Sequence, residues 1–89
     1  MQMTKLQVLA EAGVVRAVDV GRAADASGWT VQVTYASRTG ARRDVLERQR
    51  GGVRVFATLD AVARGLAGAG LSEFRVNVAG LAGAEDEPP

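Results

Sequence analysis

Arginine is the residue type with the clearest chemical potential in this sequence, and it is concentrated in one stretch. Between positions 38 and 54 there are six arginines and only two acidic residues, Asp44 and Glu47. The six are Arg38, Arg42, Arg43, Arg48, Arg50 and Arg54. Guanidinium groups pair with phosphates, and a cluster of them attracts a polyanion by releasing its counterions. The cluster predicts contacts with DNA phosphates. The alternative is a solvated surface in a chain biased towards Ala, Gly, Arg and Val.

The composition argues against an enzyme. The chain has no Cys and no His, which removes thiol nucleophiles, Cys-ligated metals and the commonest general base. It contains no phosphate-binding glycine loop, dinucleotide fingerprint or nucleophile elbow. The carboxylates of Asp19, Asp25, Asp44 and Glu47 are not spaced so that any two must meet. We therefore expect a non-catalytic protein with no cofactor, no metal and no small-molecule substrate.

A small antiparallel sheet is expected to position the arginines. Residues 29–35, Trp-Thr-Val-Gln-Val-Thr-Tyr, alternate as a half-buried strand does, and the Val-rich residues 14–22 supply its hairpin partner. A second hairpin loop covers 37–42, and residues 43–49 return as a strand whose weak apolar pattern is typical of an edge. The Thr/Gln face of 29–35 could offer hydrogen bonds to base edges. Trp29 and Tyr35 share a face with valines, which favours core packing over base stacking.

Two helices are expected to cover this sheet. The first runs over 5–12, with Thr4 as a cap and Gly13 at its end. Residues 51–52, Gly-Gly, make a backbone joint into a short strand over 53–56, and Thr58 then caps a helix with an apolar stripe. Residues 74–78 alternate as a last strand. The order α-β-β-β-β-α-β predicts an α+β fold: a two-layer, mostly antiparallel sheet of three to five strands with helices on one face.

The ends of the chain and its hydropathy complete the organisation. We expect a single α+β domain over residues 4–79 and a disordered acidic tail over 80–89, which contains Glu-Asp-Glu at 85–87. No run approaches the ~20 apolar residues that a membrane crossing needs, so we expect a cytoplasmic protein. With 89 residues and few aromatics, the core is thin, and self-association would be a natural supplement.

Three segments resemble those of small plasmid-borne ParC-like partition-associated proteins. They are residues 29–33 (Trp-Thr-Val-Gln-Val), 48–61 (Arg-Gln-Arg-Gly-Gly-Val-Arg-Val-Phe-Ala-Thr-Leu-Asp-Ala) and 70–76 (Gly-Leu-Ser-Glu-Phe-Arg-Val). The resemblance covers most of residues 4–79. It implies a role in plasmid or mobile-element maintenance, beside a partition ATPase and a DNA-binding partner.

A second resemblance concerns the start of the later helix. Phe56-Ala57-Thr58 is similar to the Phe-x-Thr opening of the helix in the arm-binding domain of tyrosine recombinases, where a three-stranded sheet precedes it. This chain differs in its Gly-Gly joint, its additional strand before the helix and its strand after it. The resemblance implies that the sheet reads DNA.

Two functions remain open from the sequence. The first is a DNA-associated accessory protein of plasmid partition that binds double-stranded DNA through its Arg-rich hairpin. The second is a protein–protein module whose sheet surface forms a homodimer or holds a partition protein without touching DNA.

Overall fold

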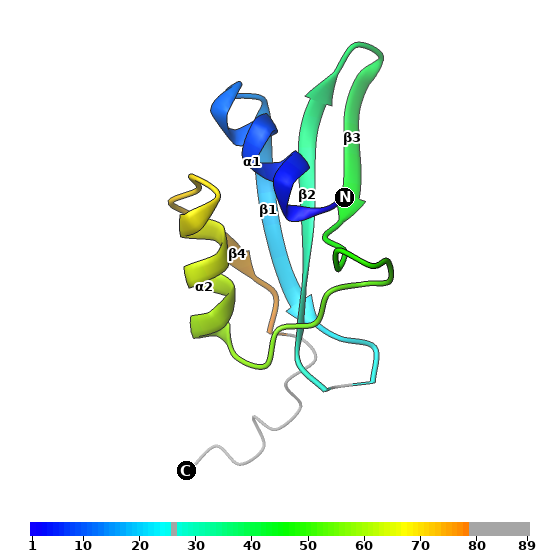
Figure 1. The fold of residues 1–89 in the computed structure, drawn as a ribbon, viewed down its shortest axis with the longest axis vertical. Coiled ribbons are helices and arrows are strands. Elements are labelled where there is room, and N and C mark those ends of the chain that lie inside the picture. Colours follow the sequence, from blue (N-terminus) through cyan, green and yellow to red (C-terminus); the bar gives the residue numbers. More distant parts are fainter. Residues whose placement is uncertain (26, 79–89) are drawn as a thin grey trace.

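The sequence folds into two layers, with helices packed on one face of a sheet (Figure 1). The computed structural model describes residues 1–25 and 27–78. Within these ranges the elements are α1 (Met3–Glu11), β1 (Val15–Arg22), β2 (Trp29–Ser37), β3 (Gly40–Val45), α2 (Leu59–Gly68) and β4 (Arg75–Val76). This confirms the predicted α+β class. The predicted acidic tail, 80–89, lies outside the described residues.

Strand β2 is central to the sheet, whose order is β3-β2-β1-β4. Its pairings with β1 and β3 are antiparallel, whereas β4 runs parallel to β1. The alternation along β2 buries Trp29, Val31, Val33 and Tyr35, each at most 6% exposed. The two aromatic side chains therefore belong to the core, as their shared face with valines predicts.

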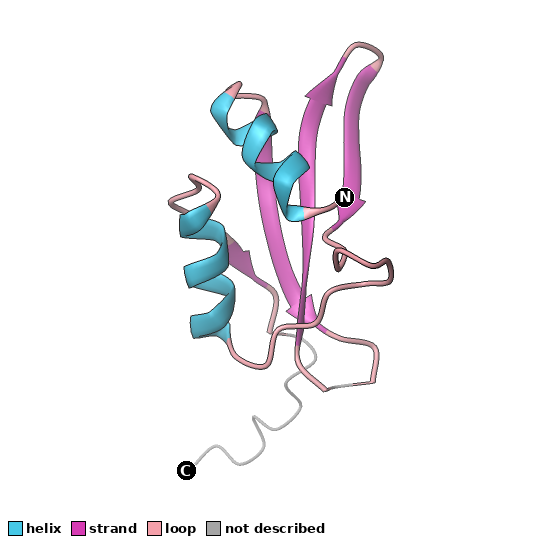
Figure 2. Cartoon of the chain, viewed as in Figure 1, coloured by secondary structure: helices cyan, strands magenta, loops and turns pink. Residues whose placement is uncertain are grey.

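Both helices cover the same face of the sheet (Figure 2). Leu6 of α1 and Val62 and Leu66 of α2 are at most 1% exposed and pack into one cluster with the inward valines of β1 and β2. No described helix covers the opposite face, which we call the open face. One-sided cover is usual for an antiparallel sheet, because its second face can be solvated.

Three elements differ from the sequence-based expectation. The strand expected over 43–49 lies at Gly40–Val45, and the last strand shortens to Arg75–Val76. The expected strand over 53–56 forms only isolated bridges, from Val53 to Glu47 and from Phe56 to Trp29. The cause is the preceding turn, in which two consecutive glycines have positive φ and carry the chain away from a continuous ladder.

The caps of the two helices lead to a first testable prediction. Thr58 accepts a hydrogen bond from Ala61 N at 3.0 Å, whereas α1 begins after Gln2, whose side chain makes no capping bond, and Thr4 lies inside the helix. Thr58→Ala should lower the free energy of unfolding by about 1 kcal/mol, a fall of roughly 4–8 °C in Tm. Thr4→Ala, the matched control, should leave Tm unchanged or slightly higher. Equal losses in both variants, measured by thermal circular dichroism, would contradict this assignment.

Candidate nucleic-acid interface

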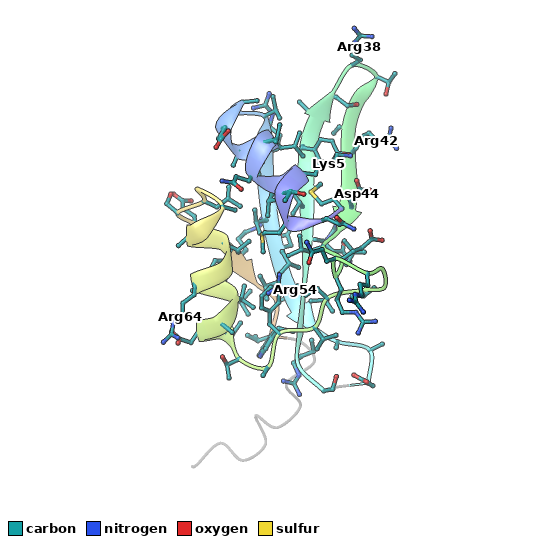
Figure 3. The ribbon with its side chains drawn as sticks, viewed as in Figure 1. Lys5, Arg38, Arg42, Asp44, Arg54 and Arg64 are labelled. Carbon is teal, nitrogen blue, oxygen red and sulfur yellow. The ribbon has the colours of Figure 1, made fainter. Side chains whose placement is uncertain are left out.

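The β2–β3 hairpin carries three of the six predicted arginines. It extends beyond the helices, and Arg38 occupies its tip, where Ser37 pairs with Gly40 across a two-residue turn (Figure 3). Arg42 lies opposite Tyr35 and so faces the helix side, whereas Arg43 lies opposite Thr34 and faces the open side. Successive residues of a strand point to opposite faces, which separates these two neighbours.

The loop after β3 carries the next two arginines. Gly51 N donates to Arg48 O and Arg48 N donates to Gly52 O, both at 2.9 Å, which folds the loop back on itself. Positive φ at both glycines permits this turn. Arg48 and Arg50 are exposed on it, beyond the end of β3 (Figure 1). We call Arg38, Arg42, Arg48 and Arg50 the basic edge, because they follow β3 from its hairpin tip to the loop beyond its end.

The two remaining arginines have partners elsewhere. The Arg54 guanidinium lies 4.6 Å from the ring centroid of Phe56, and its side chain is partly buried. Arg43 Nη2 lies 4.0 Å from Asp19 Oδ2 on the open face. The structure thus brings four of the six predicted residues to one side of the molecule and places Arg43 and Arg54 on its two faces.

The basic edge is not neutralised by neighbouring acids. Among residues 1–25 and 27–78, none of its four arginines forms an ion pair. The two nearby acids have other partners: Asp44 accepts a hydrogen bond from the Tyr35 hydroxyl at 2.9 Å, and Glu47 lies 3.4 Å from the Met1 amine. Exposed like charges that lack counter-charges create a positive potential that attracts polyanions.

Sequence reasoning missed one cation beside this edge. Lys5 Nζ lies 5.5 Å from the ring centroid of Tyr35, the residue opposite Arg42, so α1 brings a further positive charge towards β3 (Figure 3). The apolar spacing of α1 predicts that the helix docks on the sheet, but it does not predict which strand its polar residues approach.

The open face contains the predicted Thr/Gln side chains. Thr30, Gln32 and Thr34 point away from the helices and are half-buried. Asp19 of β1 lies in the same row as Gln32 and Arg75. This part of the face is therefore polar, with two guanidinium groups near one carboxylate, and the half-buried Val45 lies beside it, opposite Gln32.

Two other kinds of site are absent from the part of the chain that the structure describes. No group of three or more His, Cys, Asp and Glu side chains there could hold a metal ion. Nor is any helix in these residues long and apolar enough to cross a membrane.

Comparison with known proteins places the chain in a family. The model of the family described as ParC-like matches residues 1–83. No curated protein and no solved structure gives a significant match. Because the family model spans nearly the whole sequence, including both helices and the sheet, this chain belongs to the ParC-like family.

Proposed function

We propose that this protein is a non-catalytic accessory protein of plasmid or mobile-element maintenance that binds double-stranded DNA through the basic edge. Membership of the ParC-like family supports the setting. The observation that carries the DNA contact is the set of four exposed arginines along β3 and the following loop, none ion-paired within the described residues.

Binding at this edge would be driven mainly by counterion release. Each phosphate that a guanidinium neutralises frees condensed cations, so the logarithm of the affinity falls linearly with the logarithm of salt concentration. Arg38 and Arg42 would contact phosphates from the projecting hairpin, and Arg48 and Arg50 from the loop. The side chains are already exposed, and within the described residues none is ion-paired and only Arg48 donates a hydrogen bond, from Nε to Gly51 O at 3.2 Å, so few intramolecular contacts must break on binding.

The test is a titration of the protein with a short duplex of mixed sequence at about 50 and about 200 mM salt. Four phosphate contacts predict a loss of affinity of roughly 100-fold between these two concentrations. Fluorescence anisotropy of a labelled duplex measures both values. An absence of binding at the lower concentration would contradict the proposal.

A second candidate is self-association or partition-partner binding through the strand edge of β3. Its support is that, among the described residues, β3 forms the outer edge of the sheet and pairs only with β2, and that the Met1 amine occupies this edge only at its end, where it donates to Val45 O at 2.7 Å. An unpaired edge can add a strand from another chain. Light scattering that shows a dimer, together with no DNA binding in the titration, would favour this candidate over the first.

A further inference from the structure

Gly21 lies inside a paired strand, although nothing in the part of the chain that the structure describes requires a glycine there. It pairs with Thr30 of β2, and it is not among the glycines with positive φ. A Cβ atom built on it would meet no atom within 4 Å. Glycine weakens a strand, and inside one it often marks a place where another molecule approaches the backbone closely.

The missing side chain leaves a hollow on the open face. Its volume is ≈ 310 Å³, and the polar side chains that line it include those of Asp19, Thr30, Gln32, Arg43, Arg75 and Asn77. These residues come from all four strands or their ends, which the order β3-β2-β1-β4 brings together. Hydroxyl, amide and guanidinium groups thus surround the backbone of Gly21, which carries no side chain.

Arg75 is held in place at this hollow. Its Nε and Nη2 atoms lie 3.0 and 2.8 Å from Asp19 Oδ1, so one edge of the guanidinium faces the carboxylate. The side chain of Arg75 is 78% exposed. A guanidinium oriented in this way can present its other edge to a ligand with little further loss of rotamer freedom.

The side chains on the open face favour duplex DNA over a protein or a single strand as the partner. Protein interfaces are anchored by buried aromatic and apolar residues, but here Trp29, Tyr35 and Phe56 are buried in the core and the fourth aromatic side chain, Phe74, packs against it. The same burial removes them as stacking platforms for single-stranded bases. The side chains at the hollow are instead those that hydrogen-bond base edges, Arg to guanine and Asn or Gln to adenine.

We propose that the open face reads base edges in the major groove of duplex DNA, with a base-edge group entering the hollow at Gly21. This inference rests on the proposed function, because the basic edge would supply the phosphate contacts that place the face in the groove. Strands β1 and β2 are the two middle strands of the sheet, so their outward side chains lie at the centre of this face. The face is positive here, because Arg43 and Arg75 outnumber the single carboxylate of Asp19. A positive face suits the groove of a polyanion.

The experiment is a selection from a pool of duplexes with a randomised centre, followed by affinity measurements on the selected duplex and a scrambled one. The variants are Gly21→Val, which fills the hollow, and Arg75→Lys, which keeps the charge but not the two-pronged geometry. Gly68→Ala, on the exposed side of α2 with nothing within 4 Å of its Cβ, is the control. Circular dichroism verifies that each variant is folded.

The wild-type protein should enrich a sequence motif. Gly21→Val and Arg75→Lys should weaken binding to the selected duplex by roughly 5- to 100-fold, the range for one base contact, and binding to the scrambled duplex by less than about threefold. Gly68→Ala should change neither. Binding without any motif, or a motif that a folded Gly21→Val protein still recognises, would overturn the base-reading role and leave the phosphate role intact. No binding of any duplex would remove both.

Discussion

Replacing Arg38, Arg42, Arg48 and Arg50 together by alanine is expected to lower the affinity for duplex DNA by roughly 100- to 1,000-fold at about 100 mM salt. The dependence of log affinity on log salt should become shallower by roughly one unit per arginine removed. The physical reason is that each lost guanidinium leaves one phosphate with its condensed counterions. None of the four is buried or ion-paired within the described residues, and Arg48 makes only an exposed hydrogen bond there, from Nε to Gly51 O at 3.2 Å, so the fold should persist. Anisotropy titrations over a series of salt concentrations measure both quantities.

A matched control separates position from total charge. The double variant Arg38→Ala/Arg42→Ala and the double variant Arg16→Ala/Arg64→Ala remove the same charge. Arg64 lies on α2, away from β3 (Figure 3), and is paired with Asp60 at 2.8 Å. Arg16 lies at the irregular pairing between Val15 and Ala17 in β1. The hairpin variant should lose much more affinity than the control, and equal losses would mean that only net charge matters and that the basic edge is not the site.

The sequence predicts those parts of the fold whose pattern is local. Strand β2 follows from the unbroken alternation between Trp29 and Tyr35, and α2 follows from the Thr58 cap and its apolar stripe. Strand β3 is harder to predict, because it has no alternating apolar side chains that face the helices. Its position is determined by its pairing with β2. The segment 53–56 has a strand pattern but forms only single-residue bridges, because the preceding Gly-Gly turn carries the chain away from continuous pairing.

The arrangement of the charged residues could not be predicted, because it depends on strand order. Asp19 and Arg75 are 56 positions apart in the chain and meet only because β4 returns parallel to β1. The separation of Arg42 from Arg43 follows from strand alternation, but which of them faces the helices depends on the register with Tyr35 and Thr34. The sequence therefore identifies the residue type that would bind a polyanion, whereas the sheet determines which arginines remain available.

The β1–β2 turn and the chain after the Gly-Gly turn approach each other so closely that Gly28 leaves no room for a side chain. Trp29 N donates to Phe56 O, and Phe56 N donates to Trp29 O, both at 2.8 Å. A Cβ atom on Gly28 would lie 2.3 Å from Phe56 O and 2.8 Å from Val55 Cγ1. The first of these atoms is backbone and cannot move without breaking the paired hydrogen bonds.

Gly28→Ala should therefore destabilise the protein by roughly 2–4 kcal/mol, the sum of a packing clash and weakened buried hydrogen bonds. That is a large fraction of the about 5 kcal/mol expected for so small a domain, so Tm should fall by at least about 10 °C. The buried Phe56 side chain, 5% exposed, would shift with its backbone and loosen the core beneath α2. Chemical denaturation followed by Trp29 fluorescence measures the loss, because this indole lies beside the site of the change.

Gly21→Ala is the natural comparison, since both glycines lie on the β1–β2 hairpin and neither has positive φ. Its Cβ would enter open space, so the reduced backbone freedom of the unfolded chain should leave stability unchanged or raise it by up to about 1 kcal/mol. Similar losses in both variants would mean that glycine in this hairpin is needed for backbone conformation. A loss confined to Gly28→Ala would show that the segment 53–56 is held against the sheet by direct backbone contact, and that the loop bearing Arg48 and Arg50 is positioned from both of its ends.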